Sequence, residues 1–388
     1  MLDGLKTDNW RRKNLENSLG TREITAKRLI LRRFYSRDIT CVCQNLIHDI
    51  SVAKLFWGDE YANTYNIDSY FDRLQDLYSK PCFFLWAIQL CDEERIIGFI
   101  RADYNQNVNS AKLSFALELT RQNHGYMKEA ISAVIPYLIE EVQVNRIEAF
   151  CDNQHRIANK VLIRCGFNVE GIKRQAGFSN GEIVDLISFA ILKETYMRIK
   201  EYKNINIDDL WITNYRENGG ERLKNIMRLP KDEAVKLASQ LSTLTTSGND
   251  RYGYYFERYY EKRQKTEEWL YVQFQKHGGN PQTKHPIYFV LCDSSSLERF
   301  YGQRDRVSIK LKDIPSEYLS FTPRDSMHLK DMGLLEGTVW SKYDFLGLLK
   351  KSDRGIGNMI VNLPGLYGQP GGYIEAHLWD DDYLKFAY

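Results

Sequence analysis

A polar turn in the first half of the chain, Gln122 to Met127, contains the residue types that hold a pyrophosphate group. It lies between an apolar strand, predicted over residues 113–118, and the start of an amphipathic helix. The first turn of a helix leaves N–H groups without partners, and these groups attract anions. Gly125 would let the backbone approach such an anion, and Asn123 tolerates a positive φ better than other non-glycine residues. The six residues alone would also fit an ordinary turn, but their context of strand, turn, helix, strand and helix favours a pyrophosphate site.

Hydrophobic periodicity predicts the elements that position this turn. A helix from Tyr126 to Val142 is expected because its apolar residues recur every 3.6 positions, at Ala130, Ile131, Val134, Ile135, Leu138, Ile139 and Val142. Pro136 lies inside this helix and predicts a kink rather than a break. A strand over Arg146–Phe150 and a helix over Asn159–Cys165 follow, and Gly166 is suited to end that helix.

The rest of the first half reads as alternating strands and helices. Strands are predicted at Thr25–Phe34, Phe83–Leu90, Ile96–Tyr104, near Asn168–Ile172, and at Ile183–Leu192. Helical stretches are predicted from Asp38 onward and over residues 67–80. This mixture predicts an α/β (α+β) fold in the first half.

Two motifs together resemble the GNAT acyltransferases, most closely the Rim-type branch, which acetylates protein N-termini and small amines. The resemblance covers residues 21–200. The family's turn pattern, Q/R-x-x-G-x-G/A, is matched by Gln122 and Gly125, while Met127 stands where small residues are commoner. Relatives also read approximately D-x-x-N-x-x-S-x-x-V-L-E-K-x-G-F, and this pattern is matched at Asp152, Val161, Leu162, Gly166 and Phe167. His155 and Ala158 replace its Asn and Ser.

The resemblance implies a mixed, twisted GNAT-type sheet flanked by helices, with acetyl-CoA as cosubstrate. It assigns acetyl-CoA binding to residues at the strand end, in the turn and in the second helix, namely Leu117, Leu119, Gln122, Asn123, His124, Gly125, Tyr126, Met127 and Asn159. It also implies that the acceptor is a primary amine, either a protein N-terminus or a small molecule.

Two side chains are candidates for proton transfer in such a reaction, Glu118 and His155. A primary amine is protonated near neutral pH, so a base must remove a proton before the nitrogen attacks. Glu118 ends the strand before the turn, although a solvated charge at a strand end is an equal interpretation. His155 could act instead, but a single histidine before a helix is more often a surface residue. Rim-type relatives often carry a glutamate where this chain has Lys112. These departures keep open an alternative, a GNAT-fold protein that only binds or scaffolds.

Composition and charge argue against several other classes of protein. The net charge is +2, and lysine and arginine are scattered, so no nucleic-acid footprint is visible. No apolar stretch approaches the about 20 residues of a membrane-spanning helix, and the first residues lack the apolar core of a secretory signal. The seven cysteines show no CxxC spacing, which predicts reduced thiols in the cytoplasm and no metal site.

The length of 388 residues suits two domains. Residues 194–208 are polar and have no strong period, so we expect a boundary there. The expected parts are a GNAT domain over residues 1–200 and a separate α+β domain over residues 205–388. The sequence does not indicate an oligomeric state.

Long helices followed by strands are predicted in the second half. The helices are expected at Leu223–Leu241, Tyr252–Lys276 and Tyr343–Leu349, with a loop at Ser242–Asp250. His277-Gly278-Gly279 should end the longest helix. Strands are expected at Ile287–Leu291, Val307–Leu311, Tyr318–Phe321 and Tyr373–Trp379.

Glu375, on the last predicted strand, and Tyr288, on an earlier one, partly resemble the arrangement in NAD-dependent ADP-ribosyltransferases. In that family the glutamate would hold a ribose hydroxyl. Glu375 also alternates with apolar neighbours as any half-exposed strand residue would. We therefore prefer an accessory domain that shapes substrate choice or binds a partner, with a two-enzyme fusion as the alternative.

Overall fold

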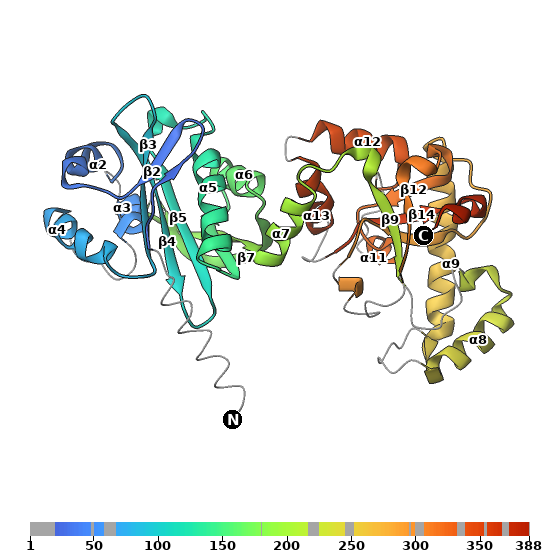
Figure 1. The fold of residues 1–388 in the computed structure, drawn as a ribbon. Helices are drawn as coiled ribbons and strands as arrows, with labels where there is room; N and C mark the ends of the chain where they lie inside the picture. The colour runs from blue at the N-terminus through green and yellow to red at the C-terminus, as the bar shows by residue number, and fades with distance from the viewer. Residues whose placement is uncertain are drawn as a thin grey trace, which may run out of the picture. The chain divides into compact units, whose positions relative to one another are not determined.

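The computed structural model describes most of the chain, namely residues 20–47, 50–57, 67–179, 181–215, 225–244, 252–294, 296–298, 306–331, 338–352, 355–366 and 372–387. It divides into two compact units, Met1–Met197 and Arg198–Tyr388 (Figure 1). One helix, α7 (Lys193–Glu201), contains the boundary between them. None of the helices in the described ranges has both the length and the apolar character needed to span a bilayer.

The first unit is built on an eight-stranded sheet with the order β1-β2-β3-β4-β5-β6-β8-β7. Its strands are β1 (Ile24–Thr25), β2 (Leu29–Arg32), β3 (Phe83–Leu90), β4 (Ile96–Asn105), β5 (Ser110–Leu117), β6 (Arg146–Asp152), β7 (Asn168–Ser179) and β8 (Glu182–Leu192). The pair β5–β6 is parallel, and the other neighbours are antiparallel. The predicted mixed sheet flanked by helices is therefore confirmed.

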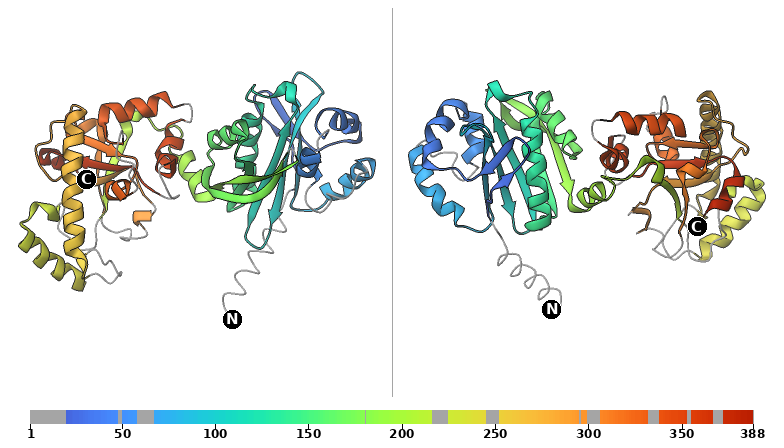
Figure 2. Two further views of the ribbon diagram at one scale, coloured as in Figure 1. Left: turned by 180° about the vertical axis from the view of Figure 1, so that it is seen from behind. Right: turned by 45° about the horizontal axis from the view of Figure 1, so that its top comes forward.

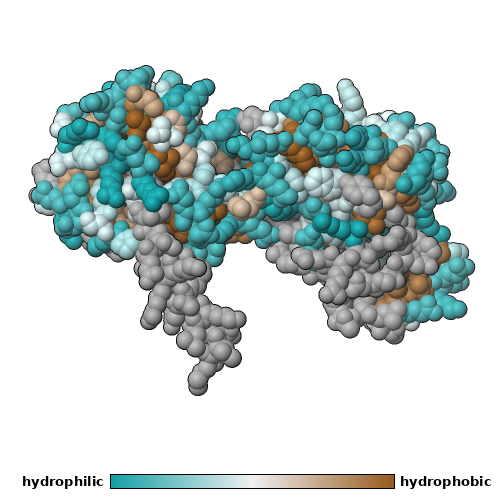
Figure 3. Space-filling model, in the orientation of Figure 1, coloured by the Kyte–Doolittle hydropathy of each residue, from teal (hydrophilic) through white to brown (hydrophobic). Residues whose placement is uncertain are grey.

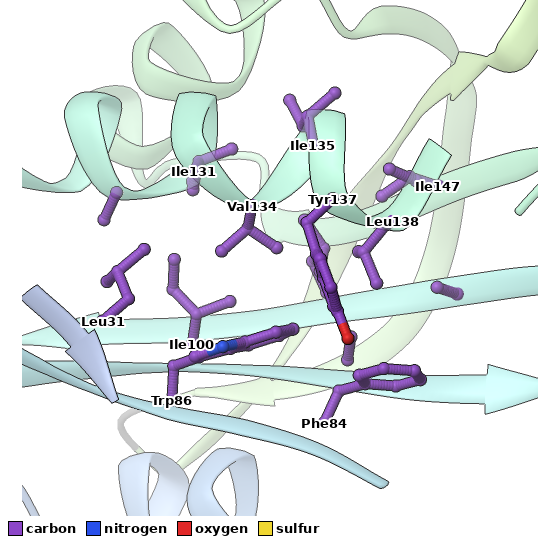
Figure 4. Close-up of a cluster of buried hydrophobic side chains, with 14 of the residues drawn as sticks. Leu31, Phe84, Trp86, Ile100, Ile131, Val134, Ile135, Tyr137, Leu138 and Ile147 are labelled. Carbon is purple, nitrogen blue, oxygen red and sulfur yellow. The ribbon is translucent and has the colours of Figure 1, made fainter. Parts of the chain in front are cut away.

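Helices cover both faces of this sheet (Figures 1 and 2). One face carries α2 (Ile39–Asn45), α3 (Ile50–Trp57) and α4 (Ile67–Tyr78), and the other carries α5 (Tyr126–Pro136) and α6 (Arg156–Arg164). The alternation of strand side chains supplies a core to each face. Figure 4 shows the core under α5, where Ile131 and Val134 point toward Trp86 and Ile100 of the sheet.

The helix predicted over Tyr126–Val142 changes its winding at Pro136. The α-helix ends there and continues as a π-helical segment, Tyr137–Glu141. The N–H of Val142 accordingly donates to the carbonyl of Tyr137, five residues back, at 3.0 Å. Proline has no N–H to give and its ring crowds the turn before it, so regular α-helical bonding is interrupted at this point. The helical winding nevertheless continues through Glu141, so the predicted absence of a break is confirmed.

The predicted short strands near residues 168–172 and 183–192 are two sides of one long hairpin, β7 and β8. The register shifts between Val169 and Gly171 and again between Lys173 and Gly177. Gly171 and Gln175 have positive φ angles of 155° and 50° at these irregularities. Such bulges interrupt the alternating pattern while the pairing continues, which explains why β7 appeared shorter in the sequence.

The second unit contains a six-stranded sheet with the order β11-β9-β10-β14-β12-β13, in which all recorded pairs are antiparallel. Its strands are β9 (Trp211–Tyr215), β10 (Ile287–Leu291), β11 (Arg306–Lys310), β12 (Leu319–Thr322), β13 (Trp340–Ser341) and β14 (Glu375–Leu378). Its helices are α8 (Lys231–Leu244), α9 (Phe256–Lys276), α11 (Ser326–Asp331), α12 (Lys342–Lys351) and α13 (Ile356–Leu366). The expected α+β character of this part is confirmed.

The helix predicted over Leu223–Leu241 begins later than expected. Its first two residues lie outside the described part of the chain, and Asn225 caps a short 3-10 turn, Ile226–Arg228. The α-helix starts only after Pro230, because proline disfavours helical geometry in the residue before it and suits the start of a helix. The helix then runs through Leu244, beyond the predicted end, while residues 245–250 of the predicted loop lie outside the described residues.

The later elements of the second unit agree more closely with prediction. Strand β10 has the predicted bounds, and α9 ends at Lys276 before His277 and the left-handed Gly278. Strand β9 and helix α13 were not predicted. On the face visible in Figure 3, hydrophilic residues cover most of the described surface.

Candidate active site

The neighbouring strands β5 and β6 separate toward the end that leads into the α5 turn. They are paired only as far as Leu113, which lies opposite Ala149. Beyond this point β5 continues to Leu117 beside β4, and β6 continues to Asp152 beside β8. The two strand ends therefore leave an opening within the sheet.

Backbone alternation directs hydrogen-bonding groups of β5 into this opening. The N–H of Glu118 donates to the carbonyl of Ile97 on β4 at 2.9 Å. Main-chain groups of successive strand residues point to opposite sides, so those of Leu117 face away from β4. The Leu117 carbonyl accepts the Nε2 group of Gln122 at 3.3 Å. The Leu117 N–H is therefore directed where a bound carbonyl oxygen could accept it.

The turn after β5 reaches α5 through two residues with left-handed backbone. Asn123 has φ +63° and Gly125 has φ +79°, so the expectation that asparagine could keep the loop shape is confirmed. Gly125 is the N-cap of α5, and no side chain caps the helix. Among the described atoms, a Cβ placed on Gly125 would meet only Nη2 of Arg28, at 3.6 Å. An uncapped helix start with open space before it is an anion-binding arrangement.

Arg28 at the start of β2 holds this turn and was not assigned to the site from the sequence. Its backbone N–H and Nε donate to the two carboxylate oxygens of Glu129 at 2.6 and 2.8 Å. Its Nη1 donates to the carbonyl of His124 at 3.2 Å, and its guanidinium lies 4.5 Å from the centre of the Tyr126 ring. Arg28 thus fixes the turn against α5 and places a positive charge beside the helix start.

Glu118 is buried next to the opening, with 8% of its surface exposed. Its Oε1 accepts hydrogen bonds from Nη2 of Arg95 at 2.6 Å and from the Thr120 hydroxyl at 2.8 Å. Its Oε2 is buried and has no hydrogen-bond partner among the residues that the structure describes. Ala116, two residues earlier, packs with the α2–α4 cluster, so alternation places Glu118 on that face. The predicted carboxylate therefore has one oxygen held and one free.

The structure gives His155 a contact that the sequence reasoning did not foresee. It is the N-cap of α6, and its Nδ1 accepts the N–H of Ala158 at 3.3 Å. The ring is exposed and occupied in capping, so its role in proton transfer stays a prediction. Asn159, one turn later, donates from Nδ2 to the carbonyls of Asp152 and Asn153. Its Oδ1 is buried, and no hydrogen-bond partner lies within the described part of the chain.

The other predicted binding residues lie along the turn, but they differ in what they can offer. Leu119 is 69% exposed, whereas the Met127 side chain is buried in the core, so Met127 can contribute only its backbone. The His124 ring stacks on Tyr126 with ring centres 5.8 Å apart, and its Nδ1 lies 2.6 Å from the carbonyl oxygen of Gln122. Within the described residues, no cluster of His, Cys, Asp and Glu has a metal-binding arrangement.

Comparison with known proteins identifies this arrangement. Residues 28–168 match the family model described as acetyltransferase (GNAT) domain. The first unit contains a GNAT acetyltransferase domain. The matched range begins at Arg28, includes the opening, the turn and α6, and ends before the second unit.

Individual proteins with similarity to the chain are also acetyltransferases. It is 25% identical over 167 residues to an uncharacterized N-acetyltransferase, YoaA, of Bacillus subtilis, covering 43% of this chain and 94% of that protein. It is 27% identical over 99 residues to the ribosomal-protein-serine acetyltransferase of Escherichia coli, covering 25% of this chain and 55% of that protein. A solved structure of Mycobacterium smegmatis RimJ in complex with CoA-disulfide shares 19% identity, with a TM-score of 0.37, and covers 45% of this chain and 88% of that one.

Acetyl-CoA is the cosubstrate of GNAT domains, and the residues present here fit its chemistry. Its pyrophosphate suits the uncapped start of α5, and its amide-containing pantetheine suits exposed main-chain groups at a strand edge. The buried Oδ1 of Asn159 is available to accept an amide N–H of the pantetheine. The family match supports acetyl transfer, and it does not support the two alternatives, a pure scaffold and a fusion with an ADP-ribosyl-transferring half.

Proposed function

We propose that the GNAT domain transfers an acetyl group from acetyl-CoA to a primary amine by direct attack on the thioester, with both substrates meeting at the β5–β6 opening. The observation that carries the proposal is the conjunction of this opening with the uncapped helix that begins at Gly125. One feature receives an anion, and the other offers main-chain donors to an extended chain. No further cofactor is needed for the step.

Acetyl-CoA supplies a thioester carbonyl carbon for the amine nitrogen to attack, and coenzyme A leaves as the thiol. The Leu117 N–H, directed into the opening, donates to the thioester oxygen, where negative charge grows during the attack. The first turn of α5 binds the pyrophosphate, and Arg28 beside it adds a positive charge. The protein thus fixes the cosubstrate at both of its polar ends.

Glu118 removes the proton that the amine must lose. Its free oxygen, Oε2, has no competing hydrogen bond, while Arg95 and Thr120 hold Oε1 in place. The proton passes to this carboxylate directly or through one water molecule. Because Glu118 lies on the face covered by α2–α4, the acceptor amine approaches from that face.

The first acceptor to test is the N-terminus of a protein. The Escherichia coli relative is named for acetylating a ribosomal protein, and we carry this acceptor class to the present chain as a proposal. A small amine is the second acceptor class. The two classes can be separated with short peptides that have free or blocked N-termini and with simple polyamines.

The test is calorimetric titration of acetyl-CoA into the full chain, followed by assay of coenzyme A thiol release with each acceptor. The variant Gly125→Val places a branched side chain at φ +79° in front of the helix and should abolish binding. Gly278→Val is the matched control, because Gly278 has φ +80° with nothing within 4 Å but lies at the end of α9.

Micromolar binding by the wild type and the control, but not by Gly125→Val, would support the site. Absence of binding by the folded wild type would refute the proposal. Binding without thiol release for any free amine would leave the site as a binding module and refute the transfer step.

A further inference from the structure

The second sheet has a polar face that is buried rather than solvated. Along β10, β12 and β14, one set of alternating residues joins an apolar core with α12 and α13. The opposite set is polar and equally buried: Ser320, Thr322 and His377 are 0% exposed, and Glu375 is 4% exposed. Helix α9 runs along the sheet (Figure 1), and its Arg263 lies over the Tyr288 ring on this face. Polar strand residues usually face water, so this face requires an explanation.

One carboxylate on α9, Glu267, is completely used by the protein. Its Oε1 accepts Nε of Arg263 at 3.3 Å, the Tyr288 hydroxyl at 3.0 Å and Nδ2 of Asn225 at 3.0 Å. Nδ1 of His285 lies 2.6 Å from its Oε2. Both carboxylate oxygens of Glu267 are therefore occupied by hydrogen bonds with neighbouring side chains, including that of Arg263.

Arg263 is oriented by these contacts, yet the outer edge of its guanidinium is not bonded. The guanidinium carbon lies 3.7 Å from the centre of the Tyr288 ring, and Glu267 accepts its Nε. In the described part of the chain, its two terminal nitrogens have no hydrogen-bond partner, although the side chain is only 9% exposed. A planar edge with two donors matches the two oxygens of a phosphate or carboxylate.

Glu375 on β14 likewise combines an oxygen that has hydrogen-bond partners with one that has none among the described residues. Its Oε2 accepts the N–H of Ser326 at 2.9 Å and lies 3.0 Å from Nε2 of His377. Ser320 accepts Nε1 of Trp379 at 2.8 Å, and its hydroxyl oxygen lies 3.1 Å from Nδ1 of His377. Within the described residues, Oε1 of Glu375 has no partner. This oxygen can only accept, so it calls for a ligand hydroxyl or N–H.

These unused groups lie close together. Tyr288 joins them, because Arg263 stacks on its face while the His377 ring meets it edge-on at 5.4 Å between centres. Glu375 stands two residues before His377 on β14 and so shares this face, and α9 is in contact with α11, which begins at Ser326. The Ser326 hydroxyl is fully buried and has no hydrogen-bond partner among the described residues.

We propose that Arg263, Glu375 and Ser326 form a binding site in the second unit for a phosphorylated diol, such as the ribose phosphate of a sugar phosphate or nucleotide. The phosphate binds the guanidinium edge, and two neighbouring hydroxyls bind the free Glu375 oxygen and the Ser326 hydroxyl. An ammonium group fits less well, because its three donors would need three acceptors.

The test is calorimetric titration of the full chain with ribose 5-phosphate, AMP, 2-deoxyribose 5-phosphate and inorganic phosphate. We expect ribose 5-phosphate or AMP to bind more tightly than the other two. Glu375→Gln and Arg263→Lys should raise the Kd by at least about tenfold, and Ser326→Ala should raise it by a smaller factor. Arg306→Gln is the control, because Arg306 is an arginine of the same sheet whose side chain is 53% exposed.

A stronger response to AMP than to ribose 5-phosphate would identify a nucleotide as the source of the phosphorylated diol, and the reverse would identify a sugar phosphate. No binding of any probe at millimolar concentration would overturn the proposal, as would equal binding of inorganic phosphate and ribose 5-phosphate. Ser326→Ala keeps the test decisive if the other variants unfold. Unchanged Kd in a folded Ser326→Ala protein, measured beside the control, would also overturn the proposal.

Discussion

Replacing Glu118 by glutamine tests the proposed base with little change in shape. Glutamine keeps an oxygen that can accept the hydrogen bonds of Arg95 and Thr120, but it cannot take a proton from an amine. Loss of a general base lowers kcat about 10²- to 10⁴-fold. The KM for acetyl-CoA should stay the same, because the α5 turn is untouched.

The structure also limits the cost of this change to stability. The Arg95 side chain is 42% exposed, so its ion pair with Glu118 contributes at most about 1 kcal/mol. The wild-type Oε2 is already buried without a partner, so an unpartnered amide there adds little new cost. The free energy of unfolding should therefore change by about 1 kcal/mol or less. A large loss of kcat in a protein of nearly normal stability would separate catalysis from folding.

The assay is thiol release from acetyl-CoA under saturating acceptor, with urea unfolding of the same samples. Glu93→Gln is the matched control, because Glu93 also pairs with an arginine, Arg121, at 3.1 Å but is more exposed. If Glu118→Gln keeps kcat within about threefold of wild type, the assignment of the base is refuted. An equal loss of kcat in Glu93→Gln would mean that negative charge near the opening affects the rate and that Glu118 does not act as a specific base.

Three further changes have outcomes that follow from the structure. Arg28→Ala removes the bonds to His124 and Glu129, so the KM for acetyl-CoA should rise about tenfold with a smaller change in kcat, as measured by steady-state kinetics. The carboxylate of Glu170 accepts hydrogen bonds from both terminal nitrogens of Arg146, and this pairing lowers the pKa of Glu170. For a partly exposed pair the stabilisation is about 0.5–1 kcal/mol. It is fully present above the ordinary glutamate pKa and is lost as the pH falls through the lowered pKa. The difference in the free energy of unfolding between wild type and Glu170→Gln, measured with urea, should therefore shrink from pH 7 to pH 3. A difference that becomes larger at low pH would contradict this. Ser326→Ala removes a buried hydroxyl that has no partner among the described residues, so the free energy of unfolding in urea should stay the same or rise by up to about 1–3 kcal/mol.

Local patterns carried the prediction of the first unit because its main elements are long and regular. The periodic helix at Tyr126 was recovered because one face of it is buried, and the strand Phe83–Leu90 because it is an apolar run buried on both faces. The turn was recovered because its conformation depends on its own residues, Asn123 and Gly125. Where the backbone departs from regularity, as in the bulged strand β7, the pattern was broken and the prediction was too short.

The residues that complete the site could not be predicted in the same way. Arg28 reaches Glu129 across 101 positions of sequence, and Arg95 reaches Glu118 across 23, through the order of strands in the sheet. Each looks like a surface charge in its own segment. In the second unit, Glu267 stands four residues after Arg263 on one helix, and only the fold shows that it is fully buried.

Three buried carboxylates in the two units differ in how many of their oxygens have hydrogen-bond partners. Glu267 uses both oxygens on four neighbouring groups, which is what folding alone would favour. Glu118 and Glu375 each have one oxygen held by two groups and the other without a partner among the described residues, although both side chains are more than nine-tenths buried. For the fully buried Oε2 of Glu118, the missing partner costs about 1–3 kcal/mol, so stability gives no reason to keep it. A transient partner does, and a proton from an amine at Glu118 and a ligand hydroxyl at Glu375 would each supply one.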